Sequence, residues 1–271
     1  MINVNNVDAI KLVADVINGS VKRDLVGNIE LIVCKSDEQY GVENAGSEKQ
    51  IIAICRESKK AKICLDDFEL IKSEVKVNDE TIVVKIISIL SFIKSMYAGD
   101  ANSAEILLYD DSESGGIILS SAVWVRLREK LLSNIIMSKV HKSHVCMVSS
   151  LLNKMKEKEY SKKNMFLVYR ILIQMDMYLT SFSEEGLRKK LDSESINDIL
   201  DRRLSKPKFN ESNVSHLLNP LKHAAFDDEI KAMFETLEKK YELYLDIVGG
   251  DNAAQNLIKN DYILKIKSEE V

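Results

Sequence analysis

The hydrophobic pattern of this chain changes near residue 85, and the change limits the folds that the chain can adopt. Upstream, short apolar runs separated by polar turns predict β-strands at residues 29–34, 50–55, 61–65 and 81–84. Downstream, apolar residues recur at the three-to-four spacing of amphipathic helices. The helices expected there span residues 85–97, 120–137, 140–156, 162–181, 193–204, 211–218, 226–248 and 252–267. The pattern predicts an α+β fold, with a small β-rich N-terminal head followed by a large helical body.

Glycine and proline mark two expected hinges, at Gly115-Gly116 and at Lys206-Pro207-Lys208. The chain has 271 residues, which is enough for one large domain or two small ones. We expect two: an α/β domain over residues 1–115 and a helical domain over residues 116–271.

The composition is that of a soluble globular protein, with 45% hydrophobic and 6% aromatic residues. No apolar run is long enough to span a membrane, and the N-terminus lacks the pattern of a signal peptide. The four cysteines, Cys34, Cys55, Cys64 and Cys146, show no C-x-x-C spacing and are expected to be buried free thiols. These features predict a cytoplasmic protein without membrane contact.

Residues 19–33 combine a Gly-Ser turn with a strand-like run, in which Gly19-Ser20 precedes Asn28-Ile29-Glu30. This segment resembles the signature of the DNA polymerase β superfamily of nucleotidyltransferases, where the strand carries Asp-x-Asp. Alternate strand residues share a face, so two such carboxylates can bind a pair of magnesium ions. Here the two positions hold Asn28 and Glu30, and an amide is a poor ligand for a hard cation. The resemblance implies the fold without its catalytic acids.

Two downstream segments extend this resemblance over residues 10–200. Residues 91–109 are similar to the "K-F-L-x-L-x-x-x-G-N-P-N-x-x-E-L-L-Y" segment of the predicted nucleotidyltransferases of bacteria and large phages. Residues 162–172 resemble that family's "K-x-A-x-H-x-x-R-L-L" helix, with Tyr169-Arg170 retained and the family histidine absent. The family's third carboxylate would fall near Val83 or Val84, and both are apolar.

A simpler interpretation of the first segment stays open. Gly19 and Ser20 can merely end a helix over residues 7–17, with Gly19 in a left-handed cap, while residues 29–33 form an ordinary buried strand. Lys22 and Arg23 could still hold a phosphate.

The expected helix over residues 226–248 carries a heptad-like stripe. Its apolar residues step by four and three, as at the a and d positions of a coiled coil. They are Ile230, Phe234, Leu237, Tyr241, Tyr244 and Val248. We expect this stripe to contribute to a homodimer seam; the alternative is that the helix packs on its own domain.

Acidic residues supply the second functional clue. The net charge is −4, and residues 221–271 hold seven Lys or Arg against eleven Asp or Glu. The acidic clusters expected to bind a partner are Asp66-Asp67, Asp110-Asp111 and Asp227-Asp228-Glu229. No basic stripe dominates, which argues against direct nucleic-acid binding. Surface acids often only maintain solubility, but if these recognise something, charge complementarity favours a basic, RNA-binding protein.

Other candidate sites are weaker. A lysine cluster is expected to form a solvated helix end and loop, with nucleic-acid contact as the alternative. Its members are Lys154, Lys156, Lys158, Lys162 and Lys163. His141 and His144 have a metal-compatible spacing but no third ligand. We expect neither a metal nor a cofactor.

Two classes of function follow. One is an active metal-dependent nucleotidyltransferase acting on a nucleic acid or protein, with Ser20, Glu30 and either Asp24 or Asp37 as improvised ligands. The other is a non-catalytic protein that binds and inhibits a basic RNA-binding or RNA-processing host protein. Loss of the expected carboxylates favours the second, because phosphoryl transfer depends on metal electrostatics. In length, low proline content and acidic balance, the chain also resembles dimeric giant-phage inhibitors of the RNase E degradosome, which implies a phage-encoded protein in the host cytoplasm.

Overall fold

The computed structural model describes residues 6–35, 49–64, 68–77, 80–107, 109, 116–133, 137–157, 161–190 and 223–248. Its strands are β1 (Val26–Lys35), β2 (Gln50–Glu57), β3 (Leu70–Val77), β4 (Glu80–Ser88) and β5 (Ile117–Ser120). Its helices are α1 (Asn6–Gly19), the short 3-10 helix η1 (Arg23–Leu25), α2 (Lys59–Cys64), α3 (Ile89–Ala98), α4 (Ala101–Ile106), α5 (Ala122–Ser133), α6 (Met137–Glu157), α7 (Lys162–Lys190) and α10 (His223–Val248). The prediction of a mixed α+β fold is confirmed.

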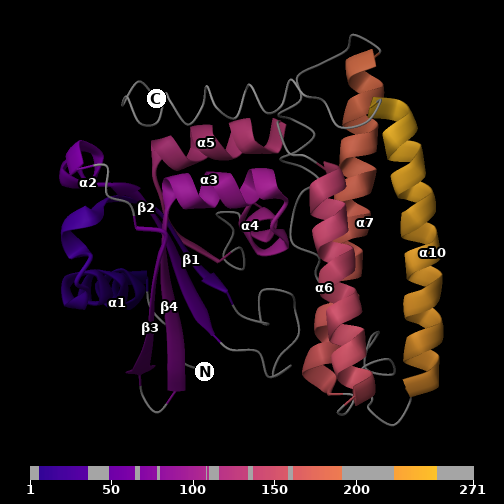
Figure 1. Cartoon of the computed structure of the whole chain (residues 1–271), viewed down its shortest axis with the longest axis horizontal. Helices are drawn as coiled ribbons and strands as arrows, with labels where there is room; N and C mark the ends of the chain where they lie inside the picture. The colour runs from indigo at the N-terminus through magenta and orange to yellow at the C-terminus, as the bar shows by residue number, and fades with distance from the viewer. Residues whose placement is uncertain are drawn as a thin grey trace.

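The strands form one five-stranded sheet in the order β3-β4-β2-β1-β5. Only the β2–β4 pair is parallel; the other neighbours are antiparallel. Alternate residues of the strands point to opposite faces of the sheet. One face, here called the α1 face, carries Ile32 and Ala53 and packs in the same core cluster as Ala9 of α1. The other, the α3 face, carries Val33 and Ile52 and packs with α3, α4 and α5 (Figure 1).

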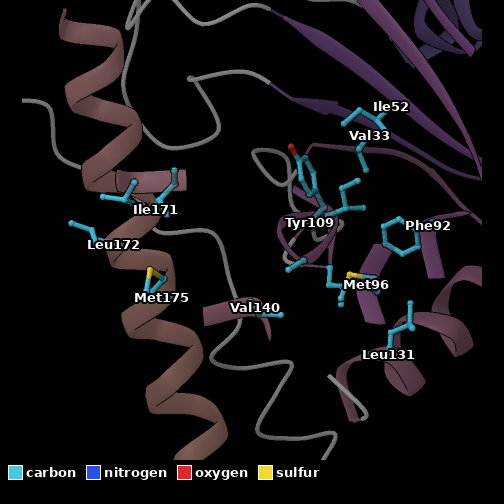
Figure 2. Close-up of a cluster of buried hydrophobic side chains, with 14 of the residues drawn as sticks. Val33, Ile52, Phe92, Met96, Tyr109, Leu131, Val140, Ile171, Leu172 and Met175 are labelled. Carbon is cyan, nitrogen blue, oxygen red and sulfur yellow. The ribbon is translucent and has the colours of Figure 1, made fainter. Parts of the chain in front are cut away.

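Three long helices form a second layer beside the sheet, with α7 between α6 and α10 (Figure 1). The core of the α3 face continues into this layer without a break. Figure 2 shows Val33 and Ile52 of the sheet beside Tyr109, with Phe92 and Met96 of α3 next to them and residues of α7 beyond. Phe92 also meets Trp124 of α5 at a ring separation of 5.4 Å, in a tilted arrangement that aromatic pairs favour.

Three expectations about the sheet were wrong. Of the strand expected over residues 61–65, residues 61–64 are helical, because the Ser58 hydroxyl accepts the backbone N–H of Ala61 at 3.1 Å and starts α2. β3 was not expected, since its residues alternate only between exposed and half-buried, as on a sheet edge. Residues 85–88 continue β4 rather than opening a helix. The side chain of Ser88 caps α3 by accepting the N–H of Ser91 at 3.0 Å, so the helix begins at Ile89.

The expected helices over residues 140–156, 162–181 and 226–248 are confirmed as α6, α7 and α10, and the one expected over residues 120–137 is confirmed for the span of α5, from Ala122 to Ser133. Those over residues 193–204, 211–218 and 252–267, and the hinge at residues 206–208, lie outside the described residues. β5 follows the boundary predicted after residue 115 but pairs with β1. None of the described helices combines the length and the hydropathy that crossing a bilayer demands.

Candidate functional site

Glu30, which the sequence resemblance assigned to a metal-binding position, has both of its carboxylate oxygens engaged. The side chain is 2% exposed, and the Arg56 Nε donates to its Oε1 at 2.5 Å. The Ser121 hydroxyl donates to its Oε2. The same Ser121 oxygen accepts the N–H of Trp124 at 3.1 Å and so caps α5. Glu30 therefore joins β1, β2 and the start of α5, which is a structural role.

The other degenerate positions do not converge on a shared site. Asn28 is exposed, and the β1–β2 register shifts on both sides of Ile29, so the regular alternation between Asn28 and Glu30 is broken. Val83 and Val84 are fully buried in β4. Among the residues that the structure describes, no group of three or more His, Cys, Asp or Glu side chains could hold a metal ion.

The Gly-Ser turn has a local explanation. Gly19 is the last residue of α1 and does not have the positive φ that the left-handed cap requires, so that part of the simpler interpretation was wrong. The Ser20 hydroxyl accepts the N–H of Lys22 at 3.1 Å. Lys22 and Arg23 are exposed beside this turn.

Asp24 and Asp37 were considered as improvised metal ligands. The Asp24 carboxylate is held by Lys60 at 2.8 Å, and this hydrogen bond lowers the pKa of Asp24. Asp37 lies outside the described residues. Asp24 thus has a cationic partner of its own on the neighbouring helix α2.

The two downstream segments that carry the family resemblance meet in a buried ion cluster, which is here called the Glu105 cluster. Glu105 of α4 accepts from Arg170 of α7, with Nη1 at 3.1 Å from Oε1. The ammonium of Lys35, at the end of β1, donates to Glu105 Oε2 at 2.6 Å. Burial lowers the pKa of Lys35, an effect that Glu105 opposes and that Arg170 reinforces. The cluster ties the sheet to the helical layer.

A glycine turn positions Glu105. Gly99 ends α3 with φ at 82°, in the left-handed region that favours glycine. Asp100 follows and caps α4 by accepting the N–H of Ser103 at 2.7 Å. The sequence marked these residues only as part of a motif, and nothing local indicated that Glu105 would reach Arg170 across 65 positions.

His141 and His144 do not form a metal site. The His144 ring lies 2.8 Å from the Val140 carbonyl through Nδ1 and is buried. The His141 ring stacks on Tyr241 of α10, with centroids 3.9 Å apart and planes inclined by 7°. Burial lowers the pKa of both imidazoles. The pair packs α6 into the core and against α10.

Four residues of the α10 stripe pack within the chain, as in the alternative that the helix covers its own domain, and the dimer seam stays a prediction. Ile230 and Leu237 are 3% and 2% exposed, and α10 packs along α7 of the same chain. Phe234 and Tyr241 are half-buried against the same core. The side chains of the remaining two seam residues, Tyr244 and Val248, lie outside the described part. A heptad pattern specifies an apolar stripe on a helix but not the surface that covers it.

The acids expected to bind a partner fall into three groups. Asp227 and Asp228 are exposed on α10. Glu229 is half-buried and hydrogen-bonds the Tyr169 side chain; burial, with help from Glu229, raises the pKa of that phenol. The other four, Asp66, Asp67, Asp110 and Asp111, lie outside the described residues.

Cysteine burial was predicted correctly in part. Cys55 is buried and Cys34 is half-buried, but Cys146 is exposed on α6, so its assignment to the interior was wrong. Burial raises the pKa of the Cys55 thiol to about 12.

Comparisons with known proteins add a distant structural likeness. No family model matches the chain, and no curated protein is similar to it. This chain is similar to a solved structure of a nucleotidyltransferase-like protein from Exiguobacterium sibiricum 255-15. The alignment covers 89% of this chain and 77% of the other protein's chain, at 10% sequence identity and a TM-score of 0.30.

Proposed function

We propose that this chain is a non-catalytic interaction protein that binds and inhibits a basic RNA-binding or RNA-processing protein. In its finer form, the proposal is a phage-encoded inhibitor whose partner is a host degradosome component of the RNase E type, met in the host cytoplasm. A homodimer stays part of the proposal, although the apolar stripe of α10 already covers α7.

The observation that supports this proposal is the outer face of α10, which lies at the edge of the molecule (Figure 1). We call its exposed carboxylates the acidic strip: Asp227, Asp228, Glu235 and Glu242. Asp228, Glu235 and Glu242 recur every seven residues and so share one side of the helix. Lys231 and Lys239 interleave with them, which leaves an excess of negative charge.

Arginine-rich segments suit such a strip because the guanidinium fork binds carboxylates through two parallel hydrogen bonds. The same strip would repel RNA phosphates. A basic segment held by the acidic strip would therefore be withdrawn from RNA, which gives inhibition by competition.

The surroundings of Glu30 support a non-catalytic role. A metal ion at this position would have to replace the guanidinium of Arg56, and Asn28 adds no charge to attract it. The rival function is tested directly with labelled triphosphates, magnesium or manganese, and bulk RNA. We expect no transfer; metal-dependent labelling that disappears in Glu30→Gln would identify an active nucleotidyltransferase instead.

Partner binding is tested with an arginine-rich RNA-binding region, labelled RNA and fluorescence anisotropy. The protein should displace the RNA, and its affinity for the basic region should fall as salt rises, because exposed charges are screened over about 8 Å at physiological ionic strength. The double variant Asp227→Lys, Asp228→Lys should slow association. The matched control, Asp8→Lys with Asp15→Lys, makes the same charge change on exposed positions of α1 and should bind normally. The proposal would be refuted if the affinity for the basic region changed neither with salt concentration nor in the Asp227→Lys, Asp228→Lys variant.

A further inference from the structure

A cavity of about 510 Å³ opens between the α3 face of the sheet and helices α3 and α4. Its volume falls within the range of small-molecule sites, roughly 300–1,000 Å³. It lies at the Lys35 end of β1, whereas Asn28 and Glu30 occupy the first half of that strand. The cavity is also separate from the acidic strip of α10.

The sheet wall of this cavity is basic. Lys35 of β1 and Lys85 of β4 both line it, with Gln50 of β2 between their strands. The Lys85 ammonium donates to the amide oxygen of Gln50 at 2.9 Å, so this contact leaves its charge uncompensated. Lys94, exposed on α3, adds a third ammonium from the opposite wall.

Among the described residues, two carboxylates line the cavity against the three lysines: Glu69, and Asp100, which also caps α4. Glu105 lies behind the wall, where it is shared between Lys35 and Arg170. Burial lowers the pKa of Lys35 most, Glu105 raises it, and the charges of Arg170 and Lys85 lower it by repulsion. A bound anion would relieve this repulsion.

The rest of the lining suits the body of an organic ligand. Ser91, Ser95 and Asn102 offer hydroxyl and amide groups for hydrogen bonds. Ile87 and Leu70 give an apolar surface, and Leu70 is 48% exposed although it is a large hydrophobic residue. An apolar or planar group stacked on Leu70 would remove that surface from water.

We infer that this cavity binds a small phosphate ester, with its phosphate at Lys85, Lys35 and Lys94 and its organic part against Leu70 and Ile87. Lysine is a common phosphate ligand, since its ammonium presents three donors and a compact charge. This site does not depend on the proposed partner binding at α10 and is tested separately.

The experiment is calorimetric titration of the full chain with adenosine 5′-monophosphate, adenosine and inorganic phosphate, at matched ionic strength. We expect the monophosphate to bind, inorganic phosphate to compete with it, and adenosine to bind at least tenfold more weakly. Lys85→Gln should weaken binding of the monophosphate about tenfold, which corresponds to about 1.4 kcal/mol. Lys94→Gln changes an exposed residue and tests the same site from α3.

The matched control is Lys59→Gln, which removes an exposed lysine of α2 that does not line the cavity. Binding in this variant should equal that of the unaltered chain. The inference is overturned if neither the monophosphate nor inorganic phosphate binds at millimolar concentration. Equal affinity for adenosine and its monophosphate, or unchanged binding in both Lys85→Gln and Lys94→Gln, would also overturn it.

Discussion

Replacing Glu105 by glutamine should destabilise the fold far more than an ordinary loss of an ion pair. The substitution keeps the shape of the side chain but removes the negative charge that faces Arg170 and Lys35. The side chains of Arg170 and Lys35 are only 6% and 19% exposed, so water can compensate little of the charge that is left. Removing one partner of a buried pair costs about 3–5 kcal/mol, and here two cations lose the same partner.

The reverse change should be milder. In Arg170→Met, Glu105 keeps the ammonium of Lys35 at 2.6 Å, and the methionine retains most of the apolar stem. We expect a cost of about 1–3 kcal/mol, the range for a lost hydrogen bond that involves a charged group. Glu105→Gln should therefore be the more destabilising of the two variants.

The assay is urea denaturation followed by circular dichroism. The midpoints are compared between variants whose unfolding free energy falls with urea concentration at the same slope. The control is Glu80→Gln, which makes the same chemical change in an ion pair with Lys49 whose side chains are 44% and 25% exposed. An exposed pair of this kind contributes about 0–1 kcal/mol. The reasoning fails if Glu105→Gln costs no more than Glu80→Gln, or less than Arg170→Met.

Three further outcomes are expected. In the folded chain the pKa values of His141 and His144 lie below their ordinary value of 6.5, so the unfolded chain takes up protons first as pH falls. The stability that the two neutral rings contribute is therefore complete above pH 6.5 and is lost as pH falls below it. A melting temperature unchanged from about pH 7.5 to about 5.5 would contradict this. Gly99→Ala should cost at least about 1–2 kcal/mol, because φ is positive and a Cβ would lie 2.5 Å from the Lys139 backbone. Gly19→Ala, with nothing within 4 Å, should be neutral or stabilising, and equal melting temperatures for the two glycine variants would refute the contrast. Iodoacetamide should modify Cys146 and spare Cys55, whose pKa is raised to about 12; mass spectrometry that finds equal labelling in the folded chain would refute this.

The sequence predicted the α+β class and four of the long helices because their apolar residues repeat at helical spacing. It missed β3, whose residues are never more than half-buried and so leave no apolar run. It extended one helix back to residue 85 because periodicity alone did not identify Ser88 as the cap. Boundaries of this kind depend on a single hydrogen bond rather than on a pattern.

The candidate sites were harder to predict because their partners are distant in sequence. Asn28 and Glu30 were interpreted as altered catalytic positions, which stays a prediction, and the Arg56 and Ser121 partners of Glu30 come from other elements. The seam residues of α10 were identified as an apolar stripe, yet the stripe itself carries no information on whether α7 or a second molecule covers it. The lysines of the cavity come from three separate elements, and only the sheet order brings Lys35 near Lys85.

The three-way contact of Glu30 also bears on how easily this chain could gain catalysis. Aspartates introduced at positions 28 and 83 would restore carboxylates to the sheet, but Glu30 would still be neutralised by Arg56 and bonded to Ser121. Freeing it would remove the anion that Arg56 holds and loosen the start of α5, so each step toward a metal site would first cost stability. A route to nucleotidyl transfer would therefore need coordinated changes in β1, β2 and α5.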